Sequence, residues 1–167
     1  MKICFYKNIF SFLLVVMLFV LPSCIFNNCP VKEKQKGLVI INVLDKDLYD
    51  DCHIAGSINV PFEEVGKYAQ SNFDTDAEIV LYCTNYFCTS SGYAQKKLKS
   101  LGFKHVWAYE GGTAEWYQLG FPINGPAKQK YLERKIKTPE YDSDELAAII
   151  TAETLKRKYD TYKGVAA

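Results

Sequence analysis

Residues 79–101 read IVLYCTNYFCTSSGYAQKKLKSL, and this stretch decides how the rest of the chain is interpreted. Its first four residues are apolar strand formers, so they predict a buried strand over 79–82. Ala94, Leu98 and Leu101 follow with helical spacing, which predicts a helix from Thr89 to Leu101. Cys83 therefore lies where a strand ends and a helix is about to begin.

A cysteine at such a junction is well placed to ionise. Unpaired N–H groups of the loop and of the first helical turn point toward the sulfur, and the helix dipole adds partial positive charge. A second cysteine, Cys88, closes the loop. We predict a reactive thiol at Cys83, and Cys88 is either a packing residue, a resolving thiol or a disulfide partner. The expected cradle for an anionic sulfur is the backbone of Thr84, Asn85, Tyr86, Phe87, Cys88 and Thr89.

Strands and helices alternate on both sides of this unit. The alternation predicts one α/β domain with a mostly parallel sheet and helices on both of its faces. The expected strands are 38–43, 57–60, 79–82 and 105–109, and the expected helices are 62–70, 89–101 and 113–119.

The C-terminal residues 126–167 differ from the rest of the chain. A basic stretch over 128–137 comes first, and residues 143–162 then show helical periodicity through Leu146, Ile149, Ile150 and Leu155. We expect an amphipathic helical extension that packs on its own domain.

The N-terminus is typical of an export signal. Lys2 and Lys7 precede an apolar run over 9–21, which is shorter than the roughly 20 residues of a spanning helix. Leu-Pro-Ser-Cys at 21–24 resembles a bacterial lipoprotein signal, which implies lipidation of Cys24 and a membrane anchor facing the periplasm. Plain secretion, an uncleaved anchor and a cytoplasmic location are the alternatives.

These observations divide the chain into four parts and place it in the cell envelope. The parts are a signal peptide over 1–23, a polar tether over 24–36, a domain over 37–125, and a basic linker with a C-terminal amphipathic helix over 126–167.

The cysteines, the histidines and the net charge limit the possible disulfides, metal sites and partners. Four cysteines besides Cys4 and Cys24 allow three pairings, of which Cys83 with Cys88 is the local one and Cys29 with Cys52 the remainder. Two distant histidines and no Cys-x2-Cys give no basis for a metal site, and no cofactor is expected. A formal net charge of +1, without a basic face interleaved with aromatics, excludes nucleic acid as a partner.

Several segments resemble one family, the rhodanese-like domains. Residues 51–61, DCHIAGSINVP, resemble the family's G-H-I-x-G-A-x-N-x-P segment, and Tyr82-Cys83 resembles the end of its catalytic strand. The spacing from Cys83 to Cys88 and on to Gly102 resembles a subgroup with a second loop cysteine. Glu110-Gly111-Gly112 with Trp116, and Gly120-Phe121-Pro122, resemble the closing signature.

The resemblance implies a sulfurtransferase that carries sulfane sulfur as a persulfide on Cys83, between a sulfur donor and a thiol acceptor. The sequence departs from the family at three places. Asn42-Val43-Leu44 stands where Asp-Val-Arg is usual, Cys52 replaces a glycine, and the opening strand and helix are absent, so the C-terminal helix is expected to cover that face.

The loop contains no Arg or Lys. Thr89 is the sixth residue after Cys83, where phosphatases on this scaffold have Arg, so a phosphatase is not expected. The same absence favours a neutral or thiol-bound persulfide over thiosulfate as the donor. Two further readings stay open: an enzyme that reduces disulfides or persulfides with Cys83 and Cys88, and a non-catalytic binding module. His53 is expected to be structural, and Trp107 and Trp116 to be core residues.

Overall fold

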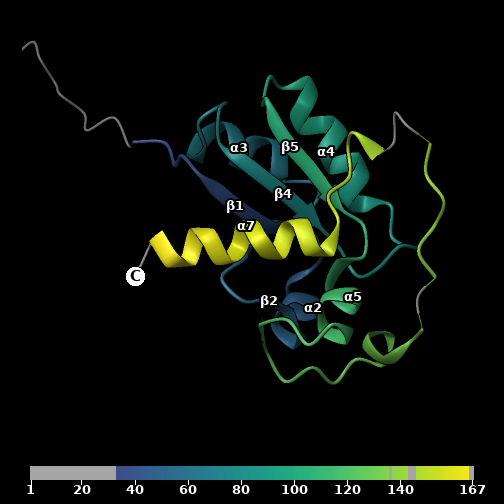
Figure 1. Ribbon diagram of the computed structural model, residues 1–167. Coiled ribbons are helices and arrows are strands. Elements are labelled where there is room, and N and C mark those ends of the chain that lie inside the picture. The colour runs from purple at the N-terminus through teal and green to yellow at the C-terminus, as the bar shows by residue number, and fades with distance from the viewer. Residues whose placement is uncertain (1–32, 136, 143–145, 166–167) are drawn as a thin grey trace, which may run out of the picture. The chain divides into compact units, whose positions relative to one another are not determined.

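The computed structural model describes residues 33–135, 137–142 and 146–165, with side chains up to Lys163 (Figure 1). The predicted signal peptide, the lipidation site Cys24 and the cysteine Cys29 lie outside the described residues. None of the described helices combines the length and the hydrophobicity that a membrane-spanning helix requires.

The elements follow the predicted alternation, and four short ones, α2, β2, β6 and the 3-10 turn η1, were not anticipated. The short helix α2 and the two-residue strands β2 and β6 carry too few residues for a periodic signal. The strands are β1 (Leu38–Asn42), β2 (His53–Ile54), β3 (Ile58–Asn59), β4 (Glu78–Tyr82), β5 (His105–Tyr109) and β6 (Ile123–Asn124), and the helices are α2 (Lys46–Asp51), α3 (Val65–Asn72), α4 (Ser90–Ser100), α5 (Gly112–Gln118), the 3-10 turn η1 (Lys130–Glu133) and α7 (Ala152–Val165).

The central sheet has the strand order β3-β1-β4-β5, and every pairing in it is parallel. Strand β1 is buried along its whole length, as its continuous apolar run predicts. In the register, Asn42 lies opposite Tyr82 and Tyr82 opposite Tyr109, so the three strands end side by side. The residue after β4, Cys83, therefore emerges at the carboxyl edge of the sheet.

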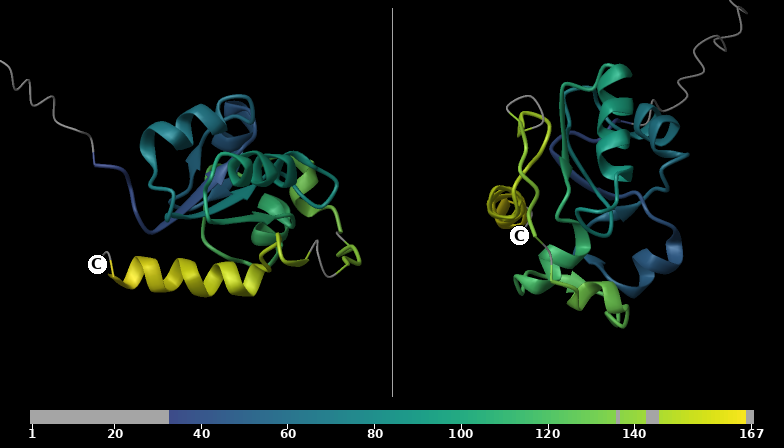
Figure 2. Two further views of the ribbon diagram at one scale, coloured as in Figure 1. Left: turned by 90° about the horizontal axis from the view of Figure 1, so that it is seen from above. Right: turned by 90° about the vertical axis from the view of Figure 1, so that its right-hand side faces the viewer.

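Helices cover both faces of this sheet, as the sequence predicts (Figures 1 and 2). One core lies between the sheet and helices α3 and α4, with Ile41, Leu81 and Leu98 at its centre. The other core lies between the opposite face and helices α5 and α7, where Tyr82, Trp116 and Leu155 are buried. The expectation that Trp116 is a core residue is confirmed.

The C-terminal helix begins later than predicted. Helix α7 starts at Ala152; before it, the Leu146 N–H donates to the Asp142 carbonyl, and Ile149 forms a single parallel bridge with Ala108 on the free edge of β5. The Ala108 N–H donates to the Ala148 carbonyl, and the Ile150 N–H donates to the Ala108 carbonyl. The Thr151 hydroxyl then accepts the Thr154 N–H and starts the helix.

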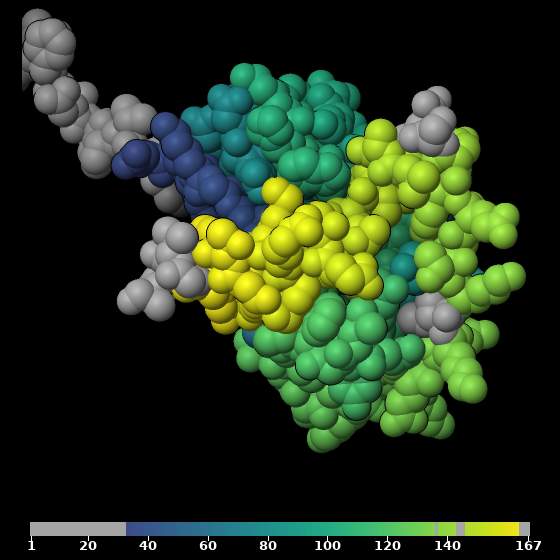
Figure 3. All heavy atoms as spheres, in the orientation of Figure 1, coloured from purple at the N-terminus to yellow at the C-terminus, as the bar shows by residue number. Residues whose placement is uncertain are grey.

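The bridge at Ile149 and helix α7 belong to the domain, and α7 contributes to its core. Ile150, Leu155 and Tyr159 are buried against the sheet face that α5 also covers. Figure 3 shows α7 lying across this face of the molecule. The expectation that the C-terminal segment packs on its own domain is confirmed.

The basic linker is also held against the domain. The carboxylate of Asp51 accepts the backbone N–H groups of Lys128 and Gln129. Leu132 is buried, and the Gln118 side-chain amide donates to its carbonyl oxygen. The linker thus packs beside α2 and α5 before the chain crosses to α7.

Candidate active site

The loop between β4 and α4 brings two free thiols together. Cys83 is buried at the end of β4, and Cys88 is partly exposed just before the first turn of α4. The N-cap residue of α4, Thr89, makes no side-chain capping bond, so the first N–H groups of this helix are open to the sulfurs.

Cys83 holds its proton in this arrangement. Its Sγ lies 3.0 Å from the Cys88 carbonyl oxygen and 3.4 Å from the Ser91 hydroxyl. The thiol also interacts with the Cys88 sulfur, so its one proton is shared between two acceptors of the same residue. That hydrogen bond and burial raise the pKa of Cys83 well above its ordinary value, although Ser91 acts in the opposite sense.

The groups around Cys88 favour its ionisation. A hydrogen bond from the Cys83 thiol, together with the N–H and hydroxyl groups of Ser90 and the N–H group of Thr84, lowers the pKa of Cys88 to about 5. Burial opposes this shift but does not outweigh it. The expectation of a depressed pKa at Cys83 is therefore corrected: the junction does favour a thiolate, but the stronger set of donors faces the second cysteine.

The backbone cradle is also shifted along the chain. The N–H group of Phe87 donates to the Asn85 side chain and that of Cys88 to the Asn85 carbonyl, so neither points at a sulfur. The donors directed at sulfur come from Thr84, Ser90 and Ser91. Asn85 closes an Asx turn here, and this local preference of asparagine explains why the two middle N–H groups are used within the loop.

Helix α5 supports the cysteine from behind. The Cys83 carbonyl accepts both the N–H and the hydroxyl of Thr113, and the Thr84 carbonyl accepts the N–H of Ala114. Gly112 makes this approach possible because its φ is +61° and a Cβ there would lie 2.5 Å from the Cys83 oxygen. The double glycine of the closing motif thus lets α5 approach the reactive loop.

A small pocket of about 180 Å³ opens beside Cys88. It contains one cation, Lys96 on α4, and one carboxylate, Glu110, which accepts a hydrogen bond from the Tyr141 hydroxyl. Sequence reasoning sought a cation only within the loop and missed Lys96. Lys96 lies two helical turns beyond Thr89, on the side of the helix that faces the loop, and this spacing could have indicated it. The lining residues are Tyr86, Cys88, Thr89, Gly92, Tyr93, Lys96 and Glu110.

Aromatic side chains surround this opening. Phe87 is 70% exposed and lies under the guanidinium group of Arg134, and Tyr93 is also exposed. Tyr86 instead turns inward and donates to the carboxylate of Glu115. Exposed rings thus lie next to Cys88 in the sequence, at Phe87, and in the lining of the pocket, at Tyr93.

The remaining candidates have structural positions. The His53 ring stacks on Tyr49 and bonds its carbonyl oxygen, which confirms the structural role expected for it. Cys52 is buried and free, and burial raises its pKa to about 11. The hydroxyl of Tyr82 accepts the Ile54 N–H and bonds Ser57, which fixes the segment after Cys52 to the sheet. Within the described ranges, no cluster of His, Cys, Asp or Glu is placed to bind a metal ion.

This architecture matches a known family. The family profile of the rhodanese-like domain matches residues 31–119. The chain belongs to the rhodanese-like domain family. Helix α7 lies beyond the matched segment, yet it covers one face of this rhodanese-like sheet together with α5.

Curated relatives include known sulfurtransferases. Thiosulfate sulfurtransferase GlpE of Coxiella burnetii is 30% identical over 83 residues, which make up 50% of this chain and 75% of the relative. The HTH-type transcriptional regulator Rv0324 of Mycobacterium tuberculosis is 26% identical over 95 residues, or 56% of this chain and 41% of the relative. Relatives whose names describe different roles thus match part of this chain.

Solved structures agree on the fold. The Alr3790 protein from Anabaena sp. is 32% identical with a TM-score of 0.50, over 53% of this chain and 67% of that chain. The BH2092 protein from Bacillus halodurans is 21% identical with a TM-score of 0.52, over 66% of this chain and 76% of that chain. The second likeness concerns the fold alone.

Proposed function

We propose that this rhodanese-like protein is a sulfurtransferase that carries sulfane sulfur as a persulfide on Cys83 and passes it to a thiol acceptor. The observation that carries the proposal is the pair of interacting thiols at the junction of β4 and α4, with donors from Thr84, Ser90 and Ser91 directed at the sulfurs. Relatives named thiosulfate sulfurtransferase support the same class of reaction.

The two cysteines have complementary roles in this proposal. The two thiols share one proton, and its transfer from the Cys83 sulfur to the Cys88 sulfur gives a minor form in which Cys83 is the attacking thiolate and Cys88 a neutral thiol. The higher pKa of Cys83 keeps this form scarce but makes its sulfur the stronger nucleophile. Cys83 then attacks the outer sulfur of the donor. With thiosulfate, the sulfur–sulfur bond of the donor breaks, sulfite leaves with the bonding electron pair, and Cys83 holds the persulfide. A thiolate acceptor next attacks the outer sulfur and returns Cys83 as a thiolate.

Attack by Cys83 on the donor requires the loop between β4 and α4 to open. The Cys88 carbonyl covers the Cys83 sulfur, and Cys83 itself is buried. A donor that enters the pocket beside Cys88 reaches Cys83 once the turn closed by Asn85 shifts away. The exposed ring of Phe87 at the tip of this turn leaves room for the movement.

Lys96 changes the expectation about the donor. The sequence favours a neutral or thiol-bound persulfide, because the loop has no cation. With Lys96 lining the pocket, an anionic donor such as thiosulfate has a positive charge to approach, opposed by the nearby carboxylate of Glu110. We therefore propose both donor classes as substrates to compare.

The test measures turnover and persulfide formation in two variants. Cys83→Ser is expected to show no turnover with either donor, with cyanide or a thiol as acceptor, and no gain of one sulfur atom in intact mass. Cys88→Ser is expected to form the persulfide more slowly and to need a higher pH, because the base is lost. Persistent turnover in Cys83→Ser would sink the assignment.

One observation favours a second candidate, a persulfide-reducing enzyme. Cys88 is the ionised and the more exposed sulfur, so a persulfide reaches it first. Cys83 would then attack the inner sulfur of a Cys88 persulfide, releasing hydrosulfide with the proton of Cys83 and leaving a Cys83–Cys88 disulfide. Sulfide release with a mass loss of two hydrogens per turnover identifies this course, and an external dithiol must then reduce the disulfide.

The cellular setting is part of the proposal. The sequence of residues 1–24 supports export and lipidation at Cys24, which would hold the domain in the cell envelope facing the periplasm. Intact mass of the protein isolated from membranes tests this: a mass that includes acyl chains on Cys24 supports it, and an unprocessed N-terminus contradicts it.

A further inference from the structure

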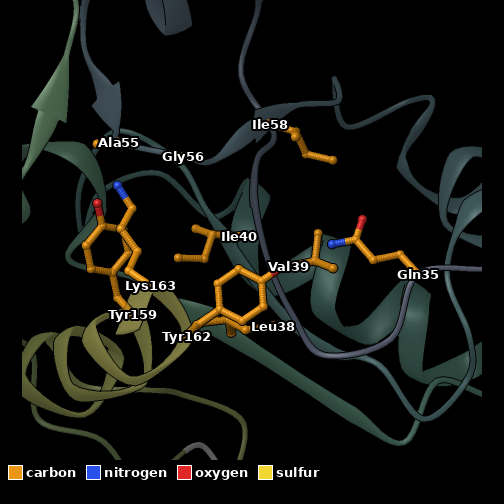
Figure 4. A pocket seen from close by; sticks show the side chains of 10 residues that line it. All are labelled: Gln35, Leu38, Val39, Ile40, Ala55, Gly56, Ile58, Tyr159, Tyr162 and Lys163. Atoms are coloured by element: carbon orange, nitrogen blue, oxygen red, sulfur yellow. The ribbon is translucent and has the colours of Figure 1, made fainter. Parts of the chain in front are cut away.

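A second cavity, of about 320 Å³, lies on the part of the domain that α7 covers (Figure 4). It shares no lining residue with the pocket beside Cys88. Its walls come from strand β1, from the segment that leads into β3, and from the last two turns of α7. The lining residues are Gln35, Leu38, Val39, Ile40, Ala55, Gly56, Ile58, Tyr159, Tyr162 and Lys163.

The cavity exists because the sheet is incomplete at this edge. Strand β3 pairs with β1 only at Ile41 and Asn42, so in the described part of the chain no strand pairs with Leu38–Ile40 on the edge of β1 that faces away from β4. Gly56, at a φ of +81°, turns the preceding segment away from β1. The space left open is walled mainly by aliphatic side chains and by the ring of Tyr162 (Figure 4).

One end of the cavity is polar. Tyr159 is only 5% exposed, and its buried hydroxyl has no hydrogen-bond partner. Figure 4 shows this hydroxyl and the ammonium group of Lys163 pointing the same way, toward Ala55 and Gly56. The Lys163 nitrogen lies 5.0 Å from the centre of the Tyr159 ring. No carboxylate is among the residues that line the cavity, so this donor and this cation have no anionic counterpart there.

We propose that the cavity binds an aliphatic carboxylate, with the carboxylate between Tyr159 and Lys163 and the chain along Leu38, Ile40 and Ile58. A purely apolar ligand would leave the Tyr159 hydroxyl unpaired, which is unfavourable for a buried donor. A dianionic phosphate would find only one cation, Lys163, among the residues that line the cavity. The volume lies at the small end of ligand pockets, about 300–1,000 Å³, which suits a chain of about eight to ten carbons.

The test compares two ligands on the full-length protein by titration calorimetry, with methyl NMR of the leucines and isoleucines to locate the site. Sodium decanoate is expected to bind at least about tenfold more tightly than decan-1-ol, because only the carboxylate accepts a charge-assisted hydrogen bond. From octanoate to decanoate, each added CH₂ should tighten binding about three- to fourfold.

Variants locate the polar end. Tyr159→Phe should weaken decanoate about tenfold and leave decan-1-ol unchanged, and Lys163→Gln should weaken decanoate and remove its salt dependence. Lys156→Gln is the matched control, because Lys156 also lies near the Tyr159 ring but does not line the cavity. Equal affinity for acid and alcohol, no saturable binding up to about 1 mM, or decanoate binding unchanged in both variants overturns the proposal.

Discussion

Replacing Cys83 with alanine tests which sulfur of the pair is ionised and why. The change removes the thiol that donates to Cys88, and this hydrogen bond is the largest cause of the low pKa of Cys88. The donors from Thr84 and Ser90 remain in place. The variant should therefore show a Cys88 pKa that rises but stays below that of an ordinary thiol.

The size of the rise follows from the strength of the bond. A hydrogen bond to a charged group contributes about 1.5–3 kcal/mol, and one pKa unit corresponds to about 1.4 kcal/mol. Losing the bond should raise the pKa of Cys88 from about 5 by about 1–2 units. Since a thiolate forms as pH rises through the pKa, the loss of reactivity should be largest near pH 5 to 6 and small above pH 8.

The assay is the rate of iodoacetamide alkylation between pH 4 and 9, with the modified cysteine mapped by mass spectrometry. In the unaltered protein, Cys88 should be modified first, with a midpoint near its low pKa. Cys83→Ser is the matched control, because its hydroxyl still donates, so the midpoint should move by about half a unit or less. An unchanged midpoint in Cys83→Ala, or preferential modification of Cys83 in the unaltered protein, would refute the reasoning.

Three further predictions concern the structure around the site. Gly112→Ala should lower the free energy of unfolding by about 2–4 kcal/mol and impair turnover. Gly120 also has a positive φ but has open space around it, so Gly120→Ala should lower that free energy by only about 1 kcal/mol. Urea unfolding measures both values, and equal losses would contradict the steric argument. Leu155→Ala should lower the free energy of unfolding by about 3 kcal/mol because it leaves a cavity in the core. Leu146 is 55% exposed, so Leu146→Ala should lower it by about 0.5 kcal/mol or less. A small loss for Leu155→Ala would mean that α7 is not integral to the fold. Asn85→Ala removes the side chain that accepts the Phe87 N–H, so it should loosen the loop and speed alkylation of the buried Cys83 several-fold. Alkylation mapped by mass spectrometry measures this rate, and an unchanged rate would argue against opening at this turn.

The long buried strands and the helices α4 and α5 were predictable because their signals are local. The continuous apolar run of β1 and the helical spacing after Thr89 each specify an element without reference to distant residues. The C-terminal segment shows where this reasoning stops. Ile149 and Ile150 fit the helical pattern, but in the structure they bridge to Ala108 at the free edge of β5 and are not part of a helix.

The candidate site was only partly predictable for a similar reason. The sequence predicted that Cys83 lies at a strand end, but it did not predict which of the two cysteines is favoured as the thiolate. That depends on hydrogen-bond directions, which place the Ser90 and Thr84 donors at Cys88 while Asn85 occupies the N–H groups between them. Lys96 entered the site through the orientation of α4, which no motif in the loop reveals.

The family, the alternating architecture and the positions of the two cysteines can be read from the amino-acid sequence, because spacing along the chain carries that information. Which cysteine is favoured as the thiolate, which cation lies beside it and how the C-terminal helix covers the second face of the sheet follow from the folded structure alone. Each of these depends on groups from distant parts of the chain meeting at one place, with burial and hydrogen-bond geometry setting the outcome. Cys83 remains at the centre of the proposed chemistry, now as a protonated thiol whose reactivity depends on its neighbour.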